Sequence, residues 1–475
     1  MAGTAELETH LLRRGYTRRA LHASGAALLA ALGVARTAWA DDGDGGEDEG
    51  MSMEPPPSPM GDDAAVTRVP ALQKTIVIDA DWLGTDNARG RHVQYWLDTW
   101  AQAHPTYKLD PQDKGDVIVR LASDTQGHMI QFPPTIFAVF KGKPGLFVNI
   151  NRDMQSRGYT TDDFFGIPEI ETWEGQRFGI PLQTNVFGWM YSVSKFEQQG
   201  VPPPNDNWTY DDAVEAARRF TRTNTVPEQY GLRWRFNWDM LPILRAAKVN
   251  YLSEDKERVN LNTAQGVAAL EFIIGVVQRQ GVAPTEKWLT DNNAAFAAAD
   301  ISFGYFAMLD GSTGTKATQN LLGPKGIKWE NMWPPKWKAT NTRNVLIDGH
   351  PYMTYDRALK DGVDAACIDL MFHLLDPDVQ EQYLIQGTGM PALKKTAYDP
   401  RFIAPPPESL VLQPQIWQFG QTYDRFAGGI DMLAAWTPIL KKAWNGEIGA
   451  GEAAVQMSRD GTAAIQRIRR PAWGR

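Results

Sequence analysis

Tryptophan side chains beside acidic or amide residues are the groups in this sequence best suited to bind a small molecule. The chain contains 17 Trp and 14 Tyr. Several Trp lie in loop-like stretches and not on the periodic apolar face of a helix, namely Trp82, Trp234, Trp238 and Trp436. A flat indole packs on the C–H face of a sugar ring, whose hydroxyls need carboxylate, amide or guanidinium partners. Asp81 followed by Trp82 offers both contacts, so the pattern favours a carbohydrate-like ligand.

Catalytic chemistry has little support in the sequence. It contains no H-E-x-x-H, C-x-x-C, G-x-S-x-G or P-loop motif and no strand-linked G-x-G-x-x-G, and the seven His are isolated. Paired carboxylates can cleave a glycosidic bond, and the candidate pairs are Glu171 with Glu174 and Asp79 with Asp81. Acidic residues near turns are usually solvated or capping groups. We therefore expect no catalytic residue, metal or cofactor, and a secreted glycosidase or lyase is the alternative function.

The cysteine count and the charge distribution narrow the class of protein further. Cys367 is the only cysteine, so no intramolecular disulfide can form, and its apolar helical surroundings predict a buried thiol. Residues 1–40 carry five Arg against two Glu, and residues 41–68 carry nine acidic residues against one Arg. The rest of the chain is close to neutral and has no cluster of Lys and Arg for phosphates, so we expect no nucleic-acid partner.

The N-terminal segment has the pattern of an export signal. Arg18 and Arg19 precede a short apolar stretch at residues 24–35, and Ala38-Trp39-Ala40 forms an A-x-A cleavage site. The paired arginines indicate the twin-arginine route, with the general secretory route as the alternative. We expect cleavage after Ala40 and a periplasmic or extracellular protein. The acidic, Gly- and Pro-rich residues 41–68 are then a disordered leader.

The elements that must position the candidate residues follow an α/β pattern. Residues 74–80 read as a buried strand, residues 81–86 as a polar loop, and residues 93–100 as part of a helix with one apolar face. Ligands collect at the carboxyl ends of strands in open α/β sheets, which is where Asp81 and Trp82 fall. Two later helices are expected to begin after the capping residues Thr209 and Thr263, and Asp212 completes a capping box with Thr209. Two more helices are expected, one over residues 363–374 and one that begins at Pro377.

Seven sequence blocks in order give the chain a family resemblance. The blocks are Gly179-Ile180-Pro181, residues 188–196, Gly200-Val201-Pro202-Pro203, residues 208–213, residues 294–308, residues 365–377 and Gly387-Thr388-Gly389-Met390-Pro391-Ala392. With these blocks the chain resembles the family 1 extracellular solute-binding proteins of ABC importers, the maltose-binding-protein-like family. Ser192 stands where the family usually has Asn, and residues 117–151 match poorly.

The resemblance implies two α/β lobes joined by three crossing segments, with a ligand cleft between them. We expect lobe 1 to comprise residues 69–183 and 346–402, and lobe 2 residues 184–345 and 403–475. The implied function is that of a receptor that closes around a saccharide or polyol and delivers it to an ABC permease in the membrane. A monomer is expected.

The resemblance also implies ligand contacts beyond Asp81 and Trp82. Asn185 matches the hinge position that bears a ligand-binding carboxylate in the family, and Trp238 matches an aromatic that stacks on sugar. Trp436 belongs to a C-terminal helix whose start contributes aromatics. Asp310, Ser312 and Thr313 follow the 294–308 block, where a loop faces the cleft in the family. Asp124 comes from the segment that matches poorly.

Overall fold

The computed structural model describes most of the chain between residues 73 and 469. The described residues are 73–80, 87–113, 115, 120, 123, 125–131, 146–165, 172–173, 175–234, 236–294, 299–312, 316–387, 389–424, 426 and 428–469.

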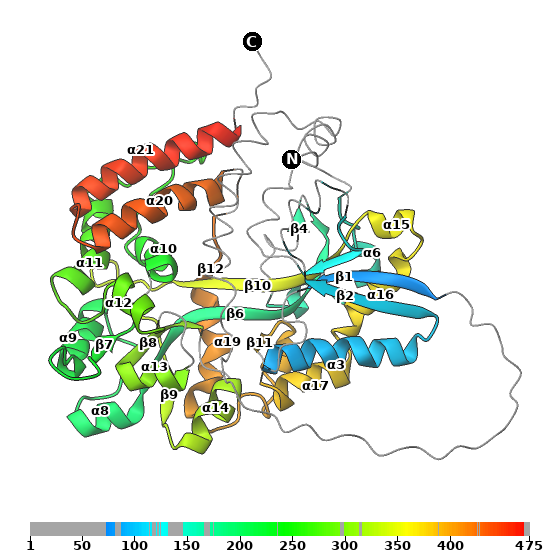
Figure 1. The fold of residues 1–475 in the computed structure, drawn as a ribbon, viewed down its shortest axis with the longest axis horizontal. Helices are drawn as coiled ribbons and strands as arrows, with labels where there is room; N and C mark the ends of the chain where they lie inside the picture. Colours follow the sequence, from blue (N-terminus) through cyan, green and yellow to red (C-terminus); the bar gives the residue numbers. More distant parts are fainter. Residues whose placement is uncertain are drawn as a thin grey trace, which may run out of the picture.

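One mixed sheet runs through both halves of the described structure (Figure 1). Its main path has the strand order β2-β1-β3-β10-β6-β8-β7, while β9 and β11 pair with β6, and β12 pairs with β10. The strands are β1 (Lys74–Ala80), β2 (Tyr107–Asp113), β3 (Met129–Gln131), β6 (Gly179–Ser192), β7 (Tyr230–Leu232), β8 (Phe306–Ser312), β9 (Trp329–Met332), β10 (Val345–Thr354), β11 (Met390–Pro391) and β12 (Gly420–Gln421), with β4 (Thr172–Trp173) and β5 (Gln176–Arg177) in a separate hairpin.

The first lobe packs helices against the strands β1, β2 and β3. Its helices are α3 (Ala88–Ala103), α6 (Asn151–Ser156), α15 (Arg357–Lys360), α16 (Asp364–His373), α17 (Pro377–Ile385) and α18 (Lys394–Ala397). The buried face of α3 carries Trp96 and Trp100, whose indole N–H groups donate to the Leu370 carbonyl at 2.9 Å and to the Asp369 carboxylate at 3.0 Å on α16. Two helices far apart in the chain are thereby joined by both apolar packing and hydrogen bonds. We call this buried cluster the lobe 1 core.

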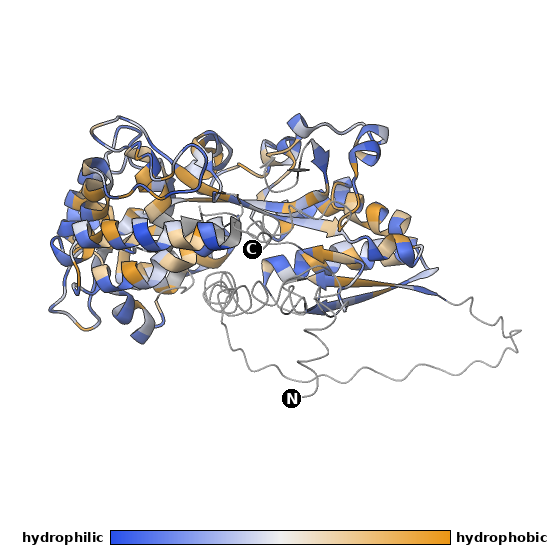
Figure 2. Cartoon of the chain, turned by 90° about the horizontal axis from the view of Figure 1, so that it is seen from above, coloured by the Kyte–Doolittle hydropathy of each residue, from blue (hydrophilic) through white to orange (hydrophobic). Residues whose placement is uncertain are grey.

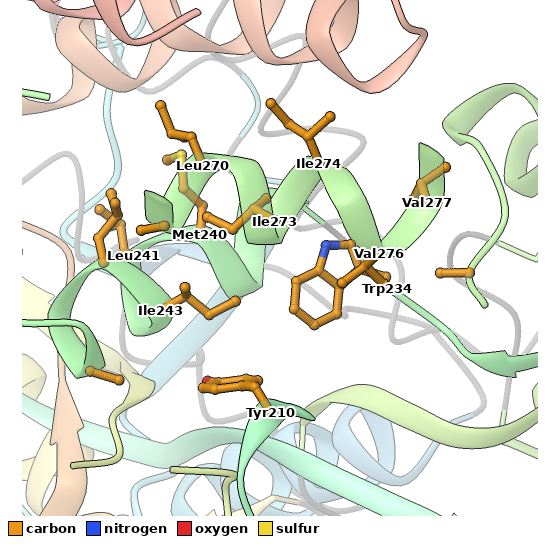
Figure 3. Packing of buried hydrophobic residues seen from close by; sticks show 14 of the residues in the cluster. Tyr210, Trp234, Met240, Leu241, Ile243, Leu270, Ile273, Ile274, Val276 and Val277 are labelled. Atoms are coloured by element: carbon orange, nitrogen blue, oxygen red, sulfur yellow. The ribbon is translucent and has the colours of Figure 1, made fainter. Parts of the chain in front are cut away.

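The second lobe is built mainly from helices, most of which are seen on the left of Figure 1, while α19 lies near the middle below β6. They are α8 (Val193–Gln199), α9 (Tyr210–Phe220), α10 (Phe236–Ala246), α11 (Ala264–Gln278), α12 (Glu286–Asp291), α13 (Ala299–Tyr305), α14 (Lys316–Leu322), α19 (Leu412–Ile416), α20 (Gly429–Trp444) and α21 (Ala450–Arg469). Figure 3 shows α10 and α11 packing around Trp234 and Tyr210. This cluster, the lobe 2 core, also contains residues of α20 and α21.

Local signals in the sequence account for the element boundaries. The side chain of Thr209 accepts a hydrogen bond from the Asp212 amide at 3.3 Å, and Asp212 accepts one from the Thr209 amide at 2.8 Å, which completes the expected capping box. Thr263 caps α11 and Pro377 begins α17, both as expected. Cys367 is buried as predicted, and burial raises the pKa of its thiol to about 12.

Candidate functional site

Two long strands, β6 and β10, connect the two lobes (Figures 1 and 2). They pair antiparallel, with Asn185 opposite Asp348 and Val186 opposite Ile347. Since directly opposed residues point to the same face of a sheet and successive residues alternate, the strand pair has two different faces. Val186 and Ile347 belong to an apolar cluster with Met390 on one face. The other face is polar over residues 183–185 of β6 and 348–350 of β10 and apolar at the neighbouring pair Phe187 and Leu346.

Four side chains form this polar face, and we call them the polar row: Gln183, Asn185, Asp348 and His350. Their exposed fractions are 0%, 6%, 0% and 7%. The Asn185 side-chain nitrogen lies 2.8 Å from His350 Nε2, and Gln183 Nε2 donates to Asn185 Oδ1 at 3.2 Å. Asp348 Oδ1 accepts from the Gly349 amide at 2.8 Å. Burial of this many polar groups is costly unless they are hydrogen-bonded, so the row is a preorganised feature of the strand pair.

Arg89 reaches the polar row from the first turn of α3. Asn87 caps this helix by accepting from the Gly90 amide at 2.8 Å, which fixes the direction of the first turn. The Arg89 guanidinium then donates from Nε to Gln183 Oε1 at 3.3 Å and from Nη2 to Asn185 Oδ1 at 3.5 Å. The first turn of α3 contains no acidic residue. A cation, two amides, an imidazole and a carboxylate therefore converge where the lobes join.

Asp79, at the carboxyl end of β1, is held in place by an ion pair and a backbone hydrogen bond. One carboxylate oxygen lies 2.7 Å from Arg120 Nη1, and the other accepts from the Gly127 amide at 2.7 Å. Burial raises the pKa of Asp79, and the Gly127 hydrogen bond and the positive charge of Arg120 oppose that shift. A Cβ atom on Gly127 would lie 2.8 Å from the Val77 carbonyl oxygen, so glycine is required for this approach. This carboxylate is held by Arg120 and Gly127, and Asp81, its partner in the alternative acid pair, lies outside the described residues.

The structure places the sequence-predicted residues in several different settings. Asn185 lies in the polar row. Asp310 and Ser312 lie in β8, opposite Trp189 and Phe187 of β6, and so belong to a strand where a loop had been expected. The reason is that β8 continues its pairing with β6 through Ser312. Trp238 lies in α10. Asp81, Trp82, Asp124 and Thr313, with the alternative acids Glu171 and Glu174, fall outside the described residues.

Trp436 lies in the lobe 2 core, which is not the position expected of a ligand contact. Its side chain is 0% exposed, and its indole N–H donates to the Met457 carbonyl at 2.9 Å. A Cβ atom on Gly461 would come within 2.6 Å of the Trp436 indole nitrogen, so α20 and α21 approach closely at this point. Trp436 lies on the buried face of α20 together with Met432 and Leu440, which are spaced four residues from it on either side.

Four residues of the candidate site, Gln183, Asp348, His350 and Arg89, were not predicted from the sequence. Gln183 could have been found, because it lies two residues before Asn185 on the same strand and so shares its face. Asp348 and His350 are more than 160 residues away from Asn185 in the sequence. Only the pairing of β10 with β6 brings them into the row. Arg89 is an ordinary charged residue of a helix until that helix is placed beside the crossing strands.

Other kinds of site have weaker support. Among the residues that the structure describes, no three His, Cys, Asp or Glu side chains are grouped to hold a metal ion. A surface pocket of about 360 Å³ lies between α9 and α11, lined among others by Glu215, Arg218, Phe272 and Arg279, and it contains no expected site residue. Within the described segments, no helix combines the length and the apolar character needed to cross a membrane.

Comparison with known families assigns the class of protein. Residues 98–409 match the family of bacterial extracellular solute-binding proteins. The match covers well over half of the chain, and the chain therefore belongs to this family. Its members bind solutes and are not enzymes, and the family places the protein in the periplasm or outside the cell. No significant match was found among the curated proteins.

Solved structures of solute-binding proteins share the fold. An ABC substrate-binding protein from Listeria monocytogenes, in complex with cycloalternan, has a TM-score of 0.70 at 13% identity, covering 83% of this chain and 99% of its own. Maltose-bound MalE3 of T. maritima has a TM-score of 0.68 at 15% identity, with coverages of 83% and 100%. The GacH receptor of Streptomyces glaucescens has a TM-score of 0.66 at 15% identity, covering 84% of this chain and 99% of its own. The expected two-lobed α/β fold is confirmed.

Proposed function

We propose that this protein is the receptor of an ABC importer and that it binds a carbohydrate or polyol at the polar row, between its two lobes. The observation that carries the proposal is the convergence of Arg89, Asn185 and His350 at the strands that connect the lobes. Buried, prearranged hydrogen-bonding groups of this kind fix the orientation of a ligand rich in hydroxyl groups. Three structural neighbours are named as complexes with cycloalternan, maltose and acarbose, which supports the same class of ligand.

Ligand binding would act on the protein by closing the lobes. A ligand shifts the equilibrium between open and closed forms only to the extent that it binds one of them better. Contacts with residues from both lobes exist together only in the closed form, so the ligand favours closure. In this proposal Asp81, Trp82 and Asp124 contribute from lobe 1, and Trp238, Asp310 and Ser312 from lobe 2. The lobe boundaries given above for the sequence remain part of the proposal, as does delivery by a monomer to permease subunits in the membrane.

The export route also belongs to the proposal. The paired arginines Arg18 and Arg19 and the A-x-A site ending at Ala40 support a cleaved twin-arginine signal. N-terminal sequencing of the secreted protein, with and without substitution of both arginines by Lys, tests it. A mature terminus at Asp41 that depends on the arginines is the expected result, and efficient export of the double variant would contradict the twin-arginine route.

The function is tested by a thermal-shift screen against saccharides, polyols, amino acids and metal ions. A ligand that binds only the folded protein adds about 2.7 kcal/mol of stability at a hundredfold excess over its Kd. We expect a saccharide or polyol to raise the Tm and to be recovered intact. Consumption of that ligand would instead favour the glycosidase or lyase. A response only to amino acids or metal ions would contradict the proposed ligand class.

A matched pair of variants tests the site. Asn185→Ala removes a group that contacts His350, Gln183 and Arg89, whereas Asn262→Ala removes an exposed amide in the second lobe. A hydrogen bond from Asn185 to the ligand contributes about 0.5–1.5 kcal/mol, so we expect Kd to rise by up to about tenfold in the first variant only. Equal Kd values in both variants, measured by calorimetry, would remove the polar row from the site.

A further inference from the structure

The side-chain hydrogen bonds that join Gln183, Asn185 and His350 run in one direction, and that direction begins at Arg89. We propose that Arg89 is a positioning residue: it fixes the orientation of the Gln183 and Asn185 amides and, through them, the tautomer of His350. The consequence for ligand recognition rests on the function proposed above. The tautomer itself can be measured without any ligand.

The first step follows from the chemistry of the guanidinium group. Arginine only donates hydrogen bonds and stays protonated in proteins. Arg89 Nε faces the Gln183 side chain at 3.3 Å, so the end of that amide facing Arg89 must be its oxygen. The amide nitrogen of Gln183 is then directed at Asn185. Gly389 closes the other side, because a Cβ atom there would lie 2.9 Å from the Gln183 amide.

The second step carries the same direction across to β10. The Asn185 oxygen accepts from Gln183 Nε2 at 3.2 Å and faces Arg89 Nη2 at 3.5 Å. The remaining end of the Asn185 side chain is its nitrogen, which donates to His350 Nε2 at 2.8 Å. A ring nitrogen that accepts a hydrogen bond carries no proton, so His350 is neutral with its proton on Nδ1.

This direction determines what the row can offer to a ligand. An Asn or Gln amide nitrogen has two protons, and the second proton of Asn185 is not used by His350. The row therefore presents a donor from Asn185 beside the positive charge of Arg89. We infer that the part of the ligand that touches Asn185 offers an acceptor oxygen, such as a hydroxyl, ether or carboxylate oxygen, and not an ammonium group.

The test uses the side-chain nitrogen signals of histidine in the purified, ¹⁵N-labelled protein without ligand. Long-range ¹H–¹⁵N spectra distinguish the two neutral tautomers, and His350→Gln assigns the signal among the seven histidines. We expect the Nδ1-protonated tautomer in the native protein. Arg89→Lys retains a donor-only cation and should keep this tautomer, whereas Arg89→Met should shift His350 toward the Nε2-protonated form.

Arg91→Met is the matched control. It removes a guanidinium group from the same turn of α3, but this group donates to Gln386 Oε1 at 2.8 Å and not to the polar row. A native Nε2-protonated or doubly protonated His350 would overturn the proposal, and so would an unchanged tautomer in Arg89→Met. Melting curves of all variants establish that each is folded. If the tautomer behaves as expected but no saccharide or polyol binds, the proposed function fails while the role of Arg89 stands.

Discussion

The clearest prediction concerns Trp436, since a core position and a ligand-binding position have opposite consequences for this residue. Two substitutions separate its contributions. Trp436→Phe keeps an aromatic ring but removes the N–H that donates to the Met457 carbonyl at 2.9 Å. Trp436→Ala removes the ring as well, from a site where the side chain is 0% exposed.

The expected magnitudes follow from these contacts. Trp436→Phe removes one hydrogen bond from the Met457 carbonyl, which lies inside α21, and the net loss of one hydrogen bond costs about 0.5–1.5 kcal/mol. Trp436→Ala adds a cavity between α20 and α21, and truncation of a buried Trp to Ala costs about 3–5 kcal/mol. The tight approach of Gly461 to the indole argues that the helices cannot close this cavity without moving their backbones. The loss for Trp436→Ala should therefore lie at or above the upper end of that range.

Two measurements on the same samples distinguish a core residue from a ligand-binding residue. Denaturant unfolding gives the change in the free energy of unfolding, provided that its dependence on denaturant concentration, the m value, is unchanged. Calorimetry gives the Kd of a ligand found in the screen. We expect Trp436→Phe to lose stability and keep its Kd within about twofold, well under the tenfold that 1.4 kcal/mol represents. Unchanged stability together with a Kd raised more than tenfold would refute the core assignment and return Trp436 to the ligand site.

Three further predictions rest on buried groups. Burial lowers the pKa of His92 to about 4, below the unfolded value of about 6.5. Between these two pKa values the unfolded chain binds more protons than the folded protein, so the free energy of unfolding should fall by about 3 kcal/mol as the pH drops from 6.5 to 4. His92→Gln should abolish this part of the pH dependence, as measured by denaturant unfolding at each pH. Gly231→Ala would place a Cβ atom 2.0 Å from the Ala217 carbonyl oxygen, and we expect it to lower Tm strongly, whereas Gly304→Ala, with nothing within 4 Å, should not. With a thiol pKa of about 12, Cys367 should resist alkylation at pH 8 in the folded protein and react once it is unfolded; fast labelling of the native form would contradict its burial.

Local features of this fold could be predicted from the sequence because their causes are local. The strand at residues 74–80 and the caps at Thr209 and Thr263 depend on residues a few positions apart, and the structure confirms them. The resemblance placed Asn185 at the connection between the lobes, where the structure also has it. The two-lobed architecture followed from the order of the sequence blocks.

The composition of the polar row could not be predicted, because it depends on strand pairing over long separations in the chain. His350 meets Asn185 only when β10 aligns with β6 in one register, and a bulge between Gly349 and Pro351 changes that register. The alternation of side chains would otherwise assign residues of β10 differently to the two faces. Trp436, by contrast, could have been assigned to the core from the sequence, because Met432, Trp436 and Leu440 recur at helical spacing.

The lobe 2 core also constrains when the protein can finish folding during its synthesis. The core includes Trp189 near its start in the chain and Ile465 near the end, and α21 packs against both α11 and α20. The lobe 1 core is complete by Leu393. As the chain emerges from the ribosome, the core of the first lobe can therefore assemble while the apolar side of α11 still lacks α20 and α21, its partners in the folded protein.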